Sequence, residues 1–190
     1  ALASIIIPSN VTNIDEEAFK NCTNFNSITF NSQTNLTNIG KEAFHNTILS
    51  SFNIPESVSY IGEGAFKSTS LTSLDIPDNV TIIQSSILYN CTNLASITIG
   101  NQVTTINNLA FSGCSNITAF IIPETVNYIY SKAFQNCSKL SLIEIPSQII
   151  NISDDAYENC TSVTDIKLNC YVQFNALFNA LATIQNVSFN

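Results

Sequence analysis

The stretch LASITIGNQVTTINNLAFSGCSN, residues 94–116, decides the fold because the rest of the chain repeats it. Its apolar stem L-x-x-I-x-I is followed by a Val and an Ile three residues apart, by an Ala-Phe pair and by a cysteine. The same order returns every 22 to 24 residues, from starts at Leu2, Phe25, Leu49, Leu71, Leu94, Ile117, Leu140 and Val163. A fixed period in this range predicts a solenoid of about eight stacked coils.

Each part of the repeat has an expected place in the coil. Leu94, Ile97 and Ile99 alternate along the chain, which predicts a short strand with one buried face. The segment before the Ala-Phe pair is too short for a stable helix, so a short helical or 3₁₀ turn is expected on the convex side. The large rings should fill the wide outer edge of a wedge-shaped coil, with Phe111 and Phe134 one above the other. The strands should then line the concave face.

Composition excludes two classes of partner. The net charge is -8 and only 11% of the residues are charged, so the clustered Lys and Arg that nucleic acids require are missing. The acidic balance equally disfavours an anionic membrane surface. No stretch approaches the roughly 18–20 apolar residues of a membrane span, so no direct membrane insertion is expected within this chain.

The segment LTSLDIPDNV, residues 71–80, together with the pattern A-F-x-N-C, resembles the BspA-like, or treponemal-type, leucine-rich repeats. The resemblance runs from Leu2 to about Cys170, with Pro, Ala-Phe and Cys recurring in phase. It implies an α/β-type repeat solenoid, a right-handed leucine-rich-repeat arc with a parallel concave β-sheet, and a single domain over residues 1–190. It also implies a secreted or surface protein of bacteria or parasitic protists that acts in adhesion, matrix-protein binding and host recognition.

The two ends of the chain depart from the repeat. The chain opens inside a repeat at Ala1, so we expect a piece of a longer array whose signal or anchor lies outside it. After Asn169 the pattern breaks, and residues 170–190 are expected to form a terminal cap. Helical spacing predicts a helix from Val172 to Ala182, and alternation predicts a strand from Ile184 to Phe189. The open first repeat makes end-to-end self-association an expected risk.

Five of the six cysteines share one register of the repeat. We interpret them as a stack of buried free thiols, since free Cys is among the most buried residue types. A bridge between Cys160 and the off-register Cys170 is the alternative. Two coils that are one residue shorter at this point carry Thr47 and Thr69 instead, which predicts a second corner geometry.

Catalytic and metal-binding motifs have little support. His45 is the only histidine and occupies a variable position, so a Ser-His-Asp or Cys-His site would depend wholly on it. The acidic runs at residues 15–17 and 154–155 are expected to favour the positive end of a helical turn, with calcium binding as the alternative. The 23-residue spacing of the cysteines lacks the paired motifs of zinc sites. We therefore predict no enzyme, no cofactor and no metal.

Asn-x-Ser/Thr sequences are numerous, and several follow from the repeat itself. In a eukaryotic secretory source the best candidates for glycosylation are Asn10, Asn79 and Asn151. A glycan at any of them would place the chain outside the cell, whereas a cytoplasmic location is the alternative.

The outward positions of the predicted strands form the candidate partner-binding surface: Ser73, Asp75, Ser96, Thr98, Ala119, Ile121, Leu142 and Glu144. Most of this face is small and polar, but Ala119, Ile121 and Leu142 form an apolar patch of the kind that marks partner sites. Sequence divergence between the repeats would give the same apolar patch without any partner. Binding of ice or a sugar by a ladder of Ser and Thr side chains is a further alternative. Ice binding needs a flat, regular Thr array, and this one is interrupted by Asn53, Asp75 and Glu144.

We predict a non-enzymatic protein-binding module of a secreted or cell-surface protein that binds through the concave sheet face. Its partner would be a protein, such as an extracellular-matrix or host surface protein. The alternative is an intracellular protein-interaction scaffold built on the same repeat.

Overall fold

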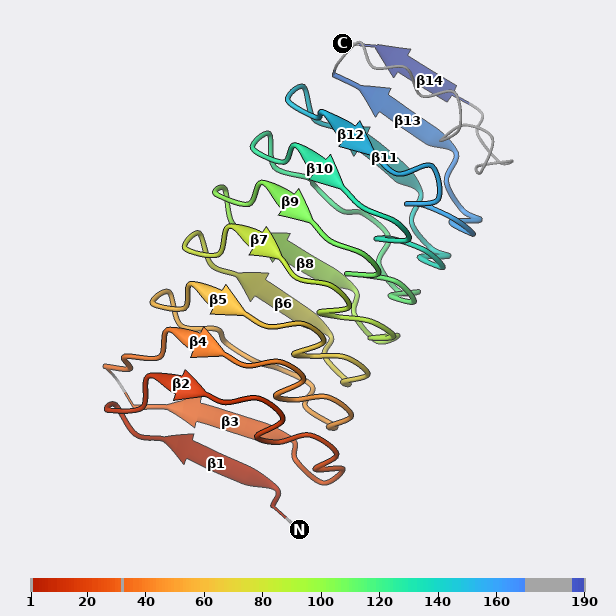
Figure 1. Cartoon of the computed structure of the whole chain (residues 1–190). Helices are drawn as coiled ribbons and strands as arrows, with labels where there is room; N and C mark the ends of the chain where they lie inside the picture. The colour runs from red at the N-terminus through yellow and green to blue at the C-terminus, as the bar shows by residue number, and fades with distance from the viewer. Residues whose placement is uncertain (1, 32, 170–185, 190) are drawn as a thin grey trace.

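The fold of the chain is a parallel β-solenoid of about seven stacked turns, seen in a computed structural model that describes residues 2–31, 33–169 and 186–189 (Figure 1). The eighth predicted start, Val163, opens a coil that runs beyond these ranges. Every strand pair is parallel, and partners lie about one repeat apart: Ser73 is opposite Ser96, and Asp75 is opposite Thr98. The solenoid predicted from the period is therefore confirmed.

The four-residue strands predicted from the alternating stem line one side of every coil, with two exceptions described below. These long strands are β1 (Ser4–Ile7), β3 (Ser27–Phe30), β6 (Ser73–Ile76), β8 (Ser96–Ile99), β11 (Leu142–Ile145), β13 (Asp165–Leu168) and β14 (Asn186–Phe189). In β6 and β8, exposed and buried residues alternate, as a half-buried strand requires. We call the outer surface of these strands the long-strand face.

A second ladder consists of two-residue strands, each formed by the last two residues of a V-x-x-I step or its equivalent, and was not predicted from the sequence. Its members are β2 (Asn13–Ile14), β4 (Asn38–Ile39), β5 (Tyr60–Ile61), β7 (Ile82–Ile83), β9 (Thr105–Ile106), β10 (Tyr128–Ile129) and β12 (Asn151–Ile152). The Ile of each strand points inward, and the preceding residue points outward. Figure 1 shows this ladder as the row of short arrows in front of the long strands. We call this side the short-strand side.

The expectation of helical or 3₁₀ turns is wrong, because no helix occurs in the described ranges. The segment around each Ala-Phe pair is instead a run of linked β-turns. In the coil of Phe111, every second amide donates within the coil, from Ala110 to Asn107, Ser112 to Leu109 and Cys114 to Phe111. The intervening amides donate to the next coil, from Leu109 to Ser131, Phe111 to Ala133 and Gly113 to Gln135. A helix would keep all these bonds to itself.

The backbone of these turns explains why they are not helical. Leu109 and Gly113 have φ values of 58° and 80°, in the left-handed region that a right-handed helix never uses. The second of these positions carries Asn in five coils, with φ between 59° and 62°: Asn21, Asn46, Asn90, Asn136 and Asn159. Asn is one of the few side chains that tolerates this region, so the backbone favours Asn at the N-C step; Ser68 holds the same position with a φ of 55°.

The aromatic rings stack from coil to coil, as the repeat predicts. The centroids of Phe111 and Phe134 lie 5.2 Å apart, and those of Phe134 and Tyr157 lie 4.9 Å apart. Phe44 and Phe66 stack at 5.4 Å with 3° between the ring planes. Equivalent positions thus sit one above the other in a core that continues from Ile7 to Leu168.

The five described cysteines are free thiols, and four of them are buried. Each buried thiol donates to a backbone carbonyl of the preceding coil, as Cys137 does to Phe111 at 3.3 Å. The Thr69 hydroxyl instead donates to the Phe66 carbonyl of its own coil, at 2.9 Å. The shorter coils thus have the second corner geometry that was predicted. Cys170, the proposed bridging partner of Cys160, lies outside the described residues.

The last described strand, β14, pairs with β13 and extends the long-strand face beyond the eighth repeat start. It falls within the predicted strand from Ile184 to Phe189, whose first two residues are outside the described ranges. The predicted helix from Val172 to Ala182 also lies outside them.

Candidate functional site

The candidate residues lie on one surface, the long-strand face. Six of the eight are exposed: Ser73, Asp75, Ser96, Thr98, Ala119 and Ile121. Leu142 and Glu144 are half-buried in β11, where Glu144 lies opposite Lys167 and pairs with it at 3.8 Å. The exposed apolar part of the face is therefore narrower than the sequence suggests. Its centre is Ile121, whose surface is 82% exposed.

The long-strand sheet is not continuous, contrary to the expected parallel sheet. Ala119–Ile122 pairs with neither β8 nor β11, although the Thr118 carbonyl still accepts a bond from the Ser141 amide at 3.2 Å. Residues 51–54 are unpaired in the same way between β3 and β6. Figure 1 draws no arrow in either place. We call the gap at residues 119–122 the sheet opening.

Both interruptions occur where the inward residue of the stem is Phe instead of Ile or Leu. The Phe120 ring lies between Phe111 and Phe134, with centroid distances of 5.1 and 5.0 Å. The Phe52 ring lies in the same way between Phe44 and Phe66, at 5.2 Å from each. Because interiors are close-packed, a ring in the place of an aliphatic side chain displaces its own strand from the ladder. The substitution is visible in the sequence, although its consequence for pairing was missed.

An apolar hollow of about 430 Å³ lies over the sheet opening. Its walls come from β8 on one side and from residues 119–123 on the other: Ser96, Ile97, Thr98, Ile99, Asn101, Ala119, Ile121 and Pro123. Apolar surface exceeds polar surface in its lining. Four of the residues predicted for the binding surface are thereby brought together around one depression.

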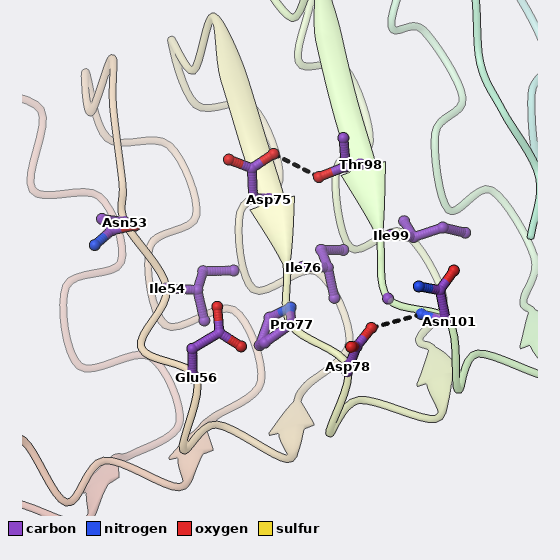
Figure 2. Close-up of a pocket in the computed structure, with 11 residues that line it drawn as sticks. Asn53, Ile54, Glu56, Asp75, Ile76, Pro77, Asp78, Thr98, Ile99 and Asn101 are labelled. Carbon is purple, nitrogen blue, oxygen red and sulfur yellow. Dashed lines mark hydrogen bonds between the residues drawn. The ribbon is translucent and has the colours of Figure 1, made fainter.

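A second hollow, of about 340 Å³, adjoins the first and shares Thr98, Ile99 and Asn101 with it. Three carboxylates line it: those of Glu56, Asp75 and Asp78 (Figure 2). No Lys, Arg or His belongs to its lining. We call it the acidic hollow.

The two aspartates of the acidic hollow are held in place by neighbouring coils. The Asp75 carboxylate accepts a bond from the Thr98 hydroxyl, and that of Asp78 accepts one from the Asn101 amide at 2.7 Å. Figure 2 shows both bonds as dashed lines. Neutral donors orient these carboxylates without cancelling their charge, so the acidic hollow keeps a negative potential.

The turns near the first coils hold a separate polar cluster around His45. Its Nδ1 atom lies 3.6 Å from the Glu42 carboxylate, and Lys20 contacts both Glu17 and Glu42. Hydrogen bonds to Glu17 and then to Glu42 raise the pKa of Lys20 to about 12, while Lys20 lowers the pKa of Glu42. The histidine thus has a carboxylate beside it. Among the described residues, no hydrogen bond joins it to the serine or cysteine that a catalytic base would activate.

Within residues 2–31, 33–169 and 186–189, no group of three or more His, Cys, Asp or Glu side chains is arranged to hold a metal ion. In the same ranges, no helix has the length and apolar character that crossing a membrane requires.

The three candidate glycosylation residues differ in their surroundings. The Asn79 side-chain amide donates to the Glu56 carbonyl at 2.7 Å, so the nitrogen that would carry a glycan is already bonded. Asn10 lies exposed in the turn after β1, and Asn151 is exposed at the start of β12.

A second set of exposed apolar side chains lies on the short-strand side and was missed from the sequence. Its members, exposed by 39 to 61%, are Tyr60, Ile82, Tyr130 and Ile150. Tyr60 and Ile82 hold the outward position of their short strands, and Tyr130 and Ile150 flank β10 and β12. The signal in the sequence was the apolar or aromatic residue beside the regular Ile.

The chain matches a known family profile and is similar in fold to several solved structures. The profile of the BspA type leucine-rich repeat region matches residues 1–118 and 82–190, in six copies. No curated protein matches the chain. Solved structures of similar fold include a leucine-rich repeat protein from Bacteroides ovatus, with 23% identity and a TM-score of 0.67 over 99% of this chain and 51% of that one.

Two further solved structures share the fold. A leucine-rich cell surface protein from Faecalibacterium prausnitzii has 21% identity and a TM-score of 0.58, over 100% of this chain and 60% of that one. The leucine-rich repeat protein of T. pallidum has 18% identity and a TM-score of 0.56, over 98% and 78%. The chain thus spans about half to three-fifths of the first two. With repeat, coil geometry and family profile in agreement, the chain belongs to the BspA-type leucine-rich repeat family.

Proposed function

We propose that the chain is a non-enzymatic protein-binding module of a secreted or cell-surface protein and that it binds through the long-strand face. The observation that carries the proposal is Ile121, 82% exposed beside an apolar hollow on a face otherwise made of small polar residues. Leaving such a side chain in water is unfavourable, and exposed apolar patches mark interaction sites. Burial of Ile121 by a partner would remove that cost.

The location and the kind of partner are proposed from relatives. The F. prausnitzii protein of similar fold is described as a cell surface protein. The resemblance to BspA-like repeats noted in the sequence implies adhesion and host recognition. A partner such as an extracellular-matrix or host surface protein follows from this likeness. The residues of the long-strand face, mainly hydroxyls with a few carboxylates, suit recognition better than bond-making chemistry.

A binding screen with matched variants tests the proposal. Immobilised fibronectin, laminin, collagen and whole serum proteins are probed with the wild-type chain and with the double variant Ile121→Asp/Leu142→Asp. A third sample, Ile150→Asp, places the same charge on an exposed Ile of the short-strand side. We expect a partner that binds the wild type and Ile150→Asp but does not bind the double variant. If a partner binds all three equally, the long-strand face is not its site.

A second candidate function is an intracellular protein-interaction scaffold. Four buried free thiols in adjacent coils favour it, since a reducing compartment keeps thiols free. Mass spectrometry of the chain isolated from its source separates the two. A glycan on Asn10 or Asn151, the exposed candidates, would establish passage through a secretory route and eliminate the scaffold; we expect Asn79 to stay unmodified because its amide is bonded.

A further inference from the structure

Unsatisfied backbone groups lie at the sheet opening. On the long-strand face, strands of adjacent coils pair through their amides and carbonyls, except at residues 51–54 and at the sheet opening. Ala119–Ile122 has no such partner in β8 or β11, and β8 is paired only with β6. The ladder of backbone hydrogen bonds is therefore interrupted between β8 and β11. The sheet opening lies beneath the apolar hollow, whose lining includes Ile121, 82% exposed.

The apolar hollow suits a single bulky side chain. Ala119 is small, Ile121 stands out from the surface, and Pro123 closes one end. The opposite wall is formed by the neutral hydroxyls of Ser96 and Thr98, so no charge faces the depression. An aliphatic or aromatic side chain would bury apolar surface here without burying a charged side chain of the lining.

The acidic hollow determines the charge of what lies beside that side chain. Asp75, Asp78 and Glu56 have no ion-pair partner among the described residues. The chain as a whole carries a net charge of -8, which attracts cations to this face. Because the two hollows share Thr98 and Asn101, a positively charged group and an apolar group of the same ligand segment reach both at once.

We propose that the two hollows together bind an extended segment of a partner protein in which an aliphatic or aromatic residue lies close to a lysine or arginine. The apolar side chain packs on Ile121, and the cationic one lies against Asp75 and Asp78. The inference rests on the proposed function, for which it names the chemistry of the ligand.

A panel of short synthetic peptides tests this directly. Each fluorescent peptide carries one Leu or Phe and, one to three positions away, Lys, Arg, Gln or Glu in a Gly-Ser background. Binding to the whole chain is followed by fluorescence anisotropy at low and high salt. We expect the Lys and Arg peptides to bind, the Gln peptides to bind about tenfold more weakly and the Glu peptides not to bind. Salt should weaken the binding of the cationic peptides only.

Variants of the chain separate the two hollows. Ile121→Ser should weaken the binding of every peptide about tenfold, since it removes the apolar contact. Asp75→Asn/Asp78→Asn keeps an acceptor oxygen for Thr98 and Asn101, so the fold is retained while the charge is lost. It should weaken the Lys and Arg peptides and leave the Gln peptides unchanged. Ile150→Ser and Asp154→Asn, at exposed positions remote from the long-strand face, are the matched controls.

Three results would overturn the inference: no peptide of the panel binds, Glu peptides bind as well as Lys peptides, or Ile121→Ser binds like the wild type. The proposed function fails separately. A partner protein lost with Ile121→Asp/Leu142→Asp, but bound through a segment without a basic residue, would remove the inference and keep the function. A partner that binds this double variant unchanged would remove the function itself.

Discussion

The ring of Tyr157 stacks on the ring of Phe134, with 4.9 Å between centroids and 3° between planes. Tyr157 thus takes the place that Phe holds in the neighbouring coils. Its hydroxyl is buried and has no hydrogen-bond partner in the described structure. A buried hydroxyl without a partner is a cost that the Phe of the other coils avoids.

We therefore expect Tyr157→Phe to stabilise the chain by about 1–2 kcal/mol, because it removes an unsatisfied polar group and keeps the stack. Urea unfolding followed by circular dichroism measures the change. Tyr130→Phe, at an exposed ring, is the control and should have little effect. A loss of stability in Tyr157→Phe would show that the hydroxyl has a partner after all.

Alkaline pH should destabilise the fold through the buried thiols. Burial raises the pKa of Cys91 and Cys114. A hydrogen bond to the Cys160 thiol, together with burial, raises the pKa of Cys137. In the unfolded chain these thiols ionise near pH 8.5, whereas in the folded chain they stay protonated. The unfolded state therefore binds fewer protons above that pH, and the free energy of unfolding should fall as pH rises from about 8 to 11.

The slope of that pH dependence identifies the thiols responsible. Under reducing conditions, Cys137→Ala should be less stable than the wild type near neutral pH but should lose stability less steeply above pH 8.5. Urea midpoints across the pH series give the slope. An unchanged slope in Cys137→Ala would assign the alkaline loss to other groups.

The left-handed turn position can be tested at Gly113, where φ is 80°. A Cβ atom there would lie 2.8 Å from the Asn90 side-chain oxygen and 3.3 Å from its Cα. Gly113→Ala should cost about 1–2 kcal/mol, since it adds both backbone strain and this contact. Gly113→Asn should cost less, because Asn tolerates this region and holds the same position in five other coils. Thermal unfolding compares them, and equal losses would contradict the role given to φ.

The sheet opening should close when its cause is removed. Phe120→Leu gives the coil the aliphatic residue of the paired coils, so residues 119–122 should return to the ladder. Hydrogen exchange followed by NMR should then show greater protection of the amides of residues 119–122. Phe52→Leu should act only on residues 51–54 and serves as the matched control. Unchanged exchange in Phe120→Leu would mean that the ring does not hold the sheet open.

The repeat period was sufficient to predict the stacked coils, the inward positions and the ring ladder, because burial follows hydrophobic spacing. The turns were mistaken for helices because the sign of φ leaves little trace in that spacing; its one signal was Asn or Gly before the cysteine. The exposed candidate residues lie on one face, and their role in binding stays a prediction. The apolar hollow over the sheet opening could not be predicted, because it lies where the coil of Phe120 leaves the ladder and the spacing of apolar residues does not report strand pairing.

The alternating amides of the turns around the Ala-Phe pairs have a consequence for how such arrays change in evolution. Half of them bond the following coil through backbone atoms alone, so this part of a coil's join to its neighbour does not depend on its outward side chains. Whole periods can accordingly be duplicated or deleted in frame while outward residues vary freely. The same scaffold can in this way acquire a new specificity without a new fold.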